Sequence, residues 1–264
     1  MTRISLLCFL FLVAFSVPWK TYGQGCSDAG FCTMGALKPD QPFNKKVEFK
    51  LRSMEISFYR GKTTVTPVVY VATADFNLSL NERNTFQVKV PYQYVTGNFG
   101  KTNTLSDISL CYTRNVLSTN RFDVNVSLGA KLPSNDSNLE EDGRPLPMYY
   151  QTSLGTYDAI LGISLISRDW LFATGIQHPF NQNNNQFIPT DWDPPVYPSP
   201  EYVAEYDPAY KLKRGTDIMF RVERNLRLSR LNFSIGALPI YRITKDEIET
   251  PPETGKREKL DGTT

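Results

Sequence analysis

Residues 85–94, with the sequence TFQVKVPYQY, alternate between apolar and polar side chains. Successive side chains of a strand point to opposite faces, so Gln87, Lys89 and Gln93 share one face and the residues at even positions share the other. The stretch 121–132, RFDVNVSLGAKL, repeats this pattern. Segments of roughly ten residues with one apolar and one polar face are typical of strands in an outer-membrane barrel, with lipid outside and water inside.

Alternating segments recur along the chain and predict an all-β fold, an antiparallel up-and-down transmembrane β-barrel. A change of phase near 52–54 suggests a β-bulge in the first strand, and residues 96–104, with two glycines, are expected to form a loop. The expected barrel strands lie within 47–242, at 47–59, a segment ending near 80, 85–95, 105–113, 121–132, 156–166, 170–177, a segment carrying Ile218 to Val222 and a segment carrying Leu231 to Tyr241.

The connections between these segments differ in length. Those after the fourth, sixth and eighth strands are short, whereas those after the fifth (133–155), the seventh (178–214) and the ninth are long. Outer-membrane barrels have short periplasmic turns and longer external loops. A soluble β-sandwich, the remaining alternative, has no reason to sort its connections in this way.

The first 23 residues have the pattern of an export signal. Arg3 supplies a positive charge, and residues 4–17 form an apolar core that is too short to cross a bilayer. We place cleavage after Gly23, with lipidation at Cys26 as the alternative, and expect the protein in the outer membrane of a Gram-negative cell envelope. Elsewhere no stretch approaches 18 consecutive apolar residues, which excludes a helical membrane protein.

Residues 24–46 are expected to form a periplasmic amino-terminal segment. Within it, Cys26 and Cys32 lie close in sequence, and exported thiols oxidise, so a small disulfide loop is the favoured interpretation. A metal site is the alternative, although two cysteines without a nearby histidine are a poor ligand set. Cys111 is expected to remain a free thiol on the polar face of its strand.

Little in the sequence points to catalysis. The single histidine, His178, lies at the end of a predicted strand, and a nucleophile normally needs an adjacent base. Acidic residues at 136–142 could bind calcium, but their order does not match an EF-hand, and solvated acidic loops are common. The net charge of +2 does not favour nucleic acid as a partner. We expect neither an enzyme nor a cofactor.

The polar faces of the predicted strands carry charges of both signs. If the strand phases are right, the barrel interior receives Lys50, Arg52, Lys89, Asp107, Asp123, Lys131, Asp158, Asp217, Arg221 and Glu223, together with Glu48. Such charges can pair across a narrow barrel and hold it shut, or they can line a polar passage for a solute. Spacing alone does not choose the solute.

Nine strands is an odd number, and residues 243–264 form a polar loop or truncated tail. Bacterial single-chain barrels have an even number of strands, with both termini on the periplasmic side. We therefore expect either a miscount or, as the favoured interpretation, a chain that lacks its final strands. An open edge in lipid would leave backbone groups unpaired, so such a chain should not insert alone.

Three stretches resemble a known group of proteins: GCSDAGFCTMGALKPDQ (25–41), RPLPMYYQTSLGTYDAILG (144–162) and ALPIYRIT (237–244). They are similar to uncharacterised outer-membrane β-barrel proteins of the Bacteroidota, which are grouped with outer-membrane transporters of the phenol-degradation MetA-like family. The resemblance covers most of residues 25–245, and the cysteine-bearing opening is its most specific part. It implies a barrel closed by further strands and a transport role, and it brings no catalytic residues.

These observations lead to one main hypothesis, an outer-membrane barrel that acts as a passive channel or transporter for small solutes. Its expected partners are membrane lipid, the outer-membrane assembly machinery and an unidentified small solute. The alternative is a non-transporting barrel, structural or surface-binding, that works through the loops at 133–155 and 178–214.

Overall fold

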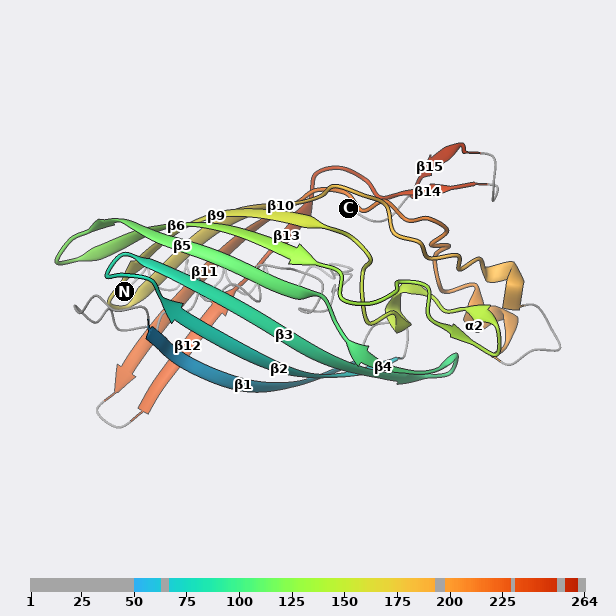
Figure 1. Ribbon diagram of the computed structural model, residues 1–264, viewed down its shortest axis with the longest axis horizontal. Helices are drawn as coiled ribbons and strands as arrows, with labels where there is room; N and C mark the ends of the chain where they lie inside the picture. The colour runs from blue at the N-terminus through green and yellow to red at the C-terminus, as the bar shows by residue number, and fades with distance from the viewer. Residues whose placement is uncertain (1–49, 63–66, 193–197, 229–230, 251–254, 261–264) are drawn as a thin grey trace, which may run out of the picture.

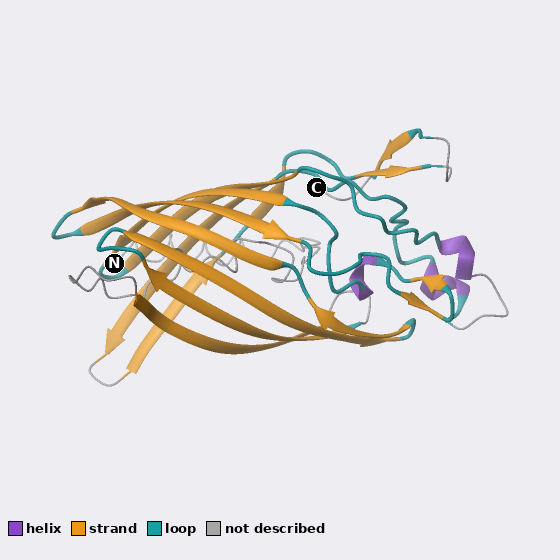
Figure 2. Cartoon of the chain, in the orientation of Figure 1, coloured by secondary structure: helices purple, strands orange, loops and turns teal. Residues whose placement is uncertain are grey.

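The computed structural model describes residues 50–62, 67–192, 198–228, 231–250 and 255–260, and the fold is all-β (Figures 1 and 2). One large antiparallel sheet dominates, with the hydrogen-bonded order β1-β2-β3-β5-β6-β9-β10-β11-β12. The sheet has eleven strands, and each of the nine on this path lies beside the one before it in the chain, as expected for an up-and-down sheet. These nine strands are β1 (Lys50–Lys62), β2 (Val68–Ser79), β3 (Asn84–Gly97), β5 (Ile108–Ser118), β6 (Phe122–Leu132), β9 (Asp158–Ser167), β10 (Trp170–Pro179), β11 (Asp217–Leu228) and β12 (Leu231–Ala237).

Two of these strands are continued by shorter ones. Strand β4 (Gly100–Leu105) precedes β5, and both pair with β3. Strand β13 (Ile240–Arg242) follows β12, and both pair with β11. The predicted loop at 96–104 is therefore wrong, because β3 and β4 form a hairpin in which Gly97 pairs with Gly100. Gly100 has a φ of +139°, a conformation that side chains other than glycine rarely adopt, so the two glycines close a tight turn rather than open a loop.

The predicted bulge in the first strand is confirmed. The register between β1 and β2 shifts between Leu51 and Ser53, so that Arg52 has no residue directly opposite it. Beyond the shift the alternation continues, with Met54, Ile56 and Phe58 exposed on the outer face. The extra residue keeps the apolar side chains on one face on both sides of the bulge.

The large sheet curls into a half-barrel (Figure 1). Its order runs from β1 to β12, and these end strands are not paired with each other in the described part of the chain. The sheet as described is thus an open half-barrel, and closure by further strands stays a prediction. The antiparallel order agrees with the prediction. The strand count does not, because the sheet has eleven strands where nine were predicted: β4 lies in the expected loop, and the last expected strand is divided into β12 and β13.

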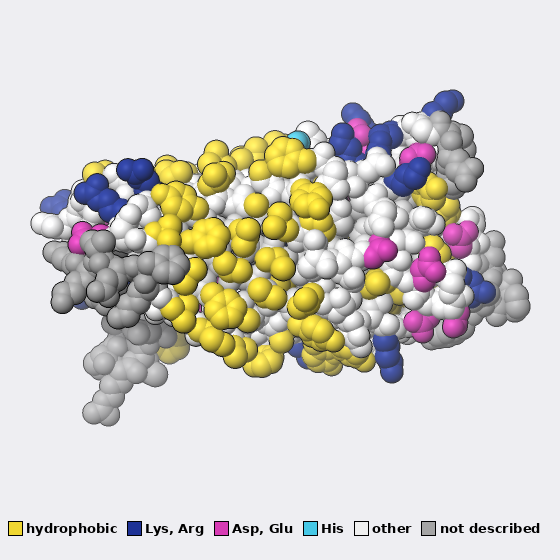
Figure 3. Space-filling view, in the orientation of Figure 1, with side chains coloured by type: hydrophobic (Ala, Val, Ile, Leu, Met, Phe, Trp, Pro, Cys, Tyr) yellow, Lys and Arg dark blue, Asp and Glu magenta, His cyan; other side chains and the backbone are white. Residues whose placement is uncertain are grey.

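The two faces of the sheet have opposite character. The convex face exposes large apolar side chains, such as Leu128 at 59% and Ile163 at 47%, which form a continuous band in Figure 3. The concave face carries buried polar residues, including Asn125 and Ser127 at 2% exposure. Water-soluble sheets bury their apolar face, so this distribution is inverted relative to a soluble fold.

The two ends of the sheet carry connections of different length, as predicted from the sequence. At one end, short turns join β2 to β3, β5 to β6 and β9 to β10. At the other end lie the connections 133–157 and 180–216, with the short strands β7 (Glu140–Glu141) and β8 (Arg144–Pro145), the 3-10 helices η3 (Met148–Tyr150) and η4 (Pro189–Trp192), and helix α2 (Pro200–Val203).

The polar tail expected at 243–264 has a more ordered structure where it is described. Strands β14 (Glu247–Glu249) and β15 (Arg257–Lys259) form a hairpin, and Lys213 bridges to Glu247. Ile248, in β14, is 2% exposed. We call the described residues of 133–157 and 180–216, together with β14 and β15, the cap.

Among the described residues, no helix is both long enough and apolar enough to cross a membrane.

Candidate functional site: the concave face and its cap

A row of polar residues crosses the concave face from strand to strand. The pairings run from Glu55 to Asp75, Lys89, Ser109, Lys131 and Asp158 on neighbouring strands. Opposed residues in an antiparallel sheet have closely spaced side chains, so these groups lie in contact range. The fold therefore gathers charges that are distant in sequence into one belt.

Lys89 and Asp75 form the first ion pair of this belt. The Nζ–Oδ2 distance is 3.1 Å, and both side chains are more than 90% buried. Gln87 also donates its amide to both Asp75 oxygens at 2.7 Å. A buried carboxylate that contacts this many donors is held in one orientation.

Asp107 and Lys131 form the second pair, with Nζ 3.2 Å from Oδ2. Asp107 additionally accepts hydrogen bonds from the Ser153 hydroxyl (2.5 Å) and the Leu154 backbone N–H (3.1 Å). Ser153 and Leu154 belong to the cap. This carboxylate therefore joins the cap to the wall of the sheet, a role that the sequence did not indicate.

A larger network lies beneath the cap. Arg242 contacts Asp217 at 2.8 Å and Asp246 at 2.5 Å, and Arg214 lies 3.5 Å from Asp217 and 3.9 Å from Asp158. Three carboxylates thus share two guanidinium groups. Burial raises the pKa of Asp246 above its usual value, although the nearby Arg242 favours the charged form.

Other predicted inward residues lie outside the belt. Arg221 and Glu223 form an ion pair at 2.6 Å on β11, and Asp123 accepts a hydrogen bond from Ser118 at 2.5 Å beside a short turn. Arg52 is partly buried at the β1 bulge. The side chain of Lys50 lies outside the described part of the chain, as do Glu48, Cys26 and Cys32.

Besides Glu55, four charged residues of the belt and network were missed from the sequence: Asp75, Arg214, Arg242 and Asp246. Asp75 lies in a regular alternating strand, so its phase relative to Tyr70 could have placed it inward. The other three lie at or beyond strand ends, where periodicity carries no signal. Their convergence depends on how the cap folds back over the sheet.

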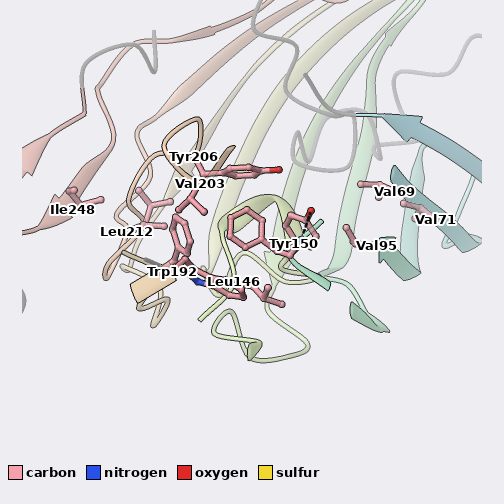
Figure 4. Close-up of a cluster of buried hydrophobic side chains, with 13 residues drawn as sticks. Val69, Val71, Val95, Leu146, Tyr150, Trp192, Val203, Tyr206, Leu212 and Ile248 are labelled. Atoms are coloured by element: carbon pink, nitrogen blue, oxygen red, sulfur yellow. Dashed lines mark hydrogen bonds between the residues drawn. The ribbon is translucent and has the colours of Figure 1, made fainter. Parts of the chain in front are cut away.

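A cluster of buried apolar side chains joins the cap to the wall of the sheet (Figure 4). Phe99, at the tip of the β3–β4 hairpin, belongs to this cluster. The ring is 2% exposed, and its centroid lies 4.8 Å from that of Trp192 and 4.9 Å from that of Tyr206, both in edge-on geometry. Val69 and Val95 of the concave wall belong to the same cluster. The connections predicted as long loops are therefore folded against the sheet, because their aromatic side chains pack on its wall.

Hydrogen bonds reinforce this packing. The Tyr202 and Tyr206 hydroxyls are 2.7 Å apart, and Tyr150 lies 3.4 Å from Tyr202. Burial raises the pKa of Tyr150, which keeps its hydroxyl neutral. Asn185 donates to the backbone carbonyl of Ser137 at 2.8 Å, so the two long connections are joined to each other as well as to the wall.

A pocket of about 140 Å³ lies between the cap and the charged network. Its walls include Met148 and Leu212, and Arg214, Arg242 and Asp246 contribute its charged part. This volume is close to that of a cavity able to hold a benzene-sized molecule. It is too small for a typical drug-sized ligand.

The remaining candidate groups are accounted for structurally. His178 Nδ1 lies 2.8 Å from the Thr216 hydroxyl, and its ring packs edge-on against Phe180. Cys111 is a free, buried thiol on the concave face, 3.5 Å from the Thr113 hydroxyl. Over the residues that the structure describes, no group of acidic, histidine or cysteine side chains is arranged to hold a metal ion.

No family model matches this chain, and no curated protein shows significant sequence similarity to it.

Proposed function

We propose that this chain is a β-barrel protein of the outer membrane that allows passive, gated passage of small polar solutes. The observation that carries the proposal is the inverted sheet, with exposed apolar side chains on the convex face and buried charges on the concave face. Lipid would solvate the convex face, while polar groups within the barrel would be hydrogen-bonded or hydrated. The proposal assigns the chain no catalytic role.

The charges of the concave face suggest how passage would be controlled. Lys89, Asp107 and Lys131 are buried in ion pairs, and the cap packs against the wall at one end of the sheet. A solute would need a rearrangement of the cap before it could reach these groups. Charges of both signs would disfavour strong selection for a single ionic sign. The resemblance to outer-membrane transporters points in the same direction.

Membrane location can be tested first. The full-length protein should be expressed with its own export signal in a Gram-negative host, and the membrane fraction washed with alkaline carbonate. We expect the protein to stay with the membrane until detergent is added. Release by osmotic shock would instead identify a soluble periplasmic sandwich and overturn the proposal.

Transport can then be separated from surface binding. In proteoliposomes loaded with an impermeant sugar, swelling in small polar solutes would report passage. A Phe99→Ala variant, which loosens the cap, should swell faster than the parent because the gate is weakened. A surface-binding barrel is the second candidate, favoured by the tight packing of the cap. It predicts no swelling in either protein.

A further inference from the structure

The end of the sheet with the short turns carries a cluster of exposed arginines. We call Arg83, Arg114, Arg121, Arg168 and Arg224 the arginine rim, and all five are exposed. None of them forms an ion pair within the described part of the chain. At this end, the carboxylates among the described residues are the exposed Glu82 and Asp169 and the half-buried Asp123, so positive charge predominates. On the face drawn in Figure 3, dark-blue Lys and Arg side chains lie beside the apolar band at the end opposite the cap.

Two members of the rim stand on the outer wall rather than on a turn. Arg114 alternates along β5 with the buried residues Thr113 and Asn115, which directs its side chain to the convex face. Arg224 alternates along β11 with Glu223 and Asn225 in the same way. A partner that contacts both Arg114 and Arg224 must therefore cover part of the convex face as well as the turns.

Arg224 is surrounded by apolar side chains. Along its own strand it lies between Val222 and Leu226, which are 40% and 43% exposed. Across the sheet it is paired with Trp170 and Ile235, and its guanidinium carbon lies 4.9 Å from the centroid of the indole ring. An arginine in an apolar band normally buries its stem and extends its head to the nearest polar layer.

Aromatic side chains accompany the rim. Trp170 stacks on Phe172 with a centroid distance of 5.6 Å, and Tyr112 lies two residues before Arg114 on the same face. Tryptophan and tyrosine gather where a bilayer changes from acyl chains to headgroups. The polar layer that Arg114 and Arg224 reach is therefore the headgroup layer.

We propose that the arginine rim binds the phosphate groups of anionic phospholipids, in the leaflet that surrounds the short-turn end of the sheet. Guanidinium groups bind phosphate oxygens in a bidentate manner, and an anionic lipid adds a net charge that a zwitterionic lipid lacks. The inference rests on the proposed membrane location and adds to it a lipid specificity and the leaflet in which it operates.

The test uses full-length protein extracted from membranes in a neutral detergent. Phosphatidylglycerol or phosphatidylethanolamine is added, and bound lipid is counted by native mass spectrometry. We expect a preference for phosphatidylglycerol that falls about tenfold in an Arg114→Gln, Arg224→Gln double variant. An Arg114→Lys, Arg224→Lys variant should keep most of the preference, because it retains both charges. In the parent protein, added salt should weaken the preference for phosphatidylglycerol, because it screens the charges.

The matched control removes two exposed cations on strands at the opposite end, with Lys62→Gln and Lys101→Gln. The proposal is overturned if this control loses as much phosphatidylglycerol binding as the rim variant, or if the parent shows no preference. Membrane partition of each variant is measured separately. Protein that stays in the membrane without lipid preference refutes the rim alone, whereas protein absent from the membrane refutes the proposed location as well.

Discussion

Individual buried charges on the concave face contribute to the stability of the folded protein. Lys89 and Asp75 are buried side by side, and removing one partner of such a pair leaves the other charge unpaired in a poorly solvated place. The cost is usually larger than the net contribution of the intact pair, because desolvation of both groups has already offset much of their attraction.

A Lys89→Met variant should therefore lose about 3 kcal/mol of unfolding free energy, measured by urea titration in detergent or vesicles. Changing Asp75 to Asn as well should recover part of the loss, since the remaining amide is neutral and can still accept from Gln87. Lys101→Met, at an exposed position, serves as the control and should change stability by less than about 0.5 kcal/mol. A double variant less stable than Lys89→Met would contradict the argument.

Glu249 provides a pH-dependent contact at the edge of the cap. Its pKa is lowered chiefly by a hydrogen bond from Lys211, whose Nζ lies 3.1 Å from Oε1. A lowered pKa in the folded state means that the contact stabilises the cap above the usual Glu range and is lost as the pH falls through the folded pKa. In Lys211→Met, carboxyl NMR titration should show the Glu249 pKa shifted upward. An unchanged midpoint would show that Lys211 is not the cause.

Among the elements of the fold, the β3–β4 hairpin connects the wall to the cap. Its tip residue, Phe99, is surrounded by aromatic side chains from both long connections. Phe99→Ala should lower the stability of the cap by about 3–5 kcal/mol, because truncation of a buried ring leaves a cavity. The sheet itself should persist, since its strands pair independently of this ring.

Limited proteolysis would measure this effect, with faster cleavage expected within 180–216 and slow cleavage within the strands. Phe180→Ala is the matched control, because that ring is 67% exposed. Equal cleavage rates in the two variants would mean that Phe99 does not hold the cap in place.

Elements with strict alternation were the most predictable. The segment predicted at 121–132 is strand Phe122–Leu132, and that predicted at 85–95 is strand Asn84–Gly97. The prediction of a loop at 96–104 is wrong, because glycine residues occur in tight hairpin turns as well as in open connections. Two glycines facing each other across a two-residue turn instead close a hairpin, and burial of Phe99 against distant residues supports that turn.

At the scale of the whole molecule, the proposed function requires that lipid, and not water, surrounds the convex face of the sheet. In lipid, an arginine at the middle of this face would cost about 2–4 kcal/mol, whereas at an interface it would cost at most about 1 kcal/mol. In water, replacement of an exposed apolar residue would have little effect on stability. The same arginine substitution, made at the middle and at the end of one strand, therefore distinguishes lipid from water around the sheet.

Ile163 and Tyr157 suit this comparison, as both are exposed and lie on or beside β9. We expect Ile163→Arg to reduce the amount of folded protein in the membrane several-fold, while Tyr157→Arg, at the cap end, is tolerated. The measurement is the folded fraction in washed membranes by gel mobility without heating. Equal tolerance of both variants would indicate that no lipid surrounds the sheet.

The amino-acid sequence by itself determined the all-β class, the antiparallel up-and-down order of the main strands and the opposite character of the two faces of the large sheet. These properties follow from a local period of two, which needs no knowledge of distant residues. Tertiary structure alone decided the rest: the pairing of Asp75 with Lys89, the network around Arg214 and Arg242, and the packing of two long connections on Phe99. Such contacts join residues far apart in the chain, so they exist only once the sheet has curled and the cap has folded against its concave face.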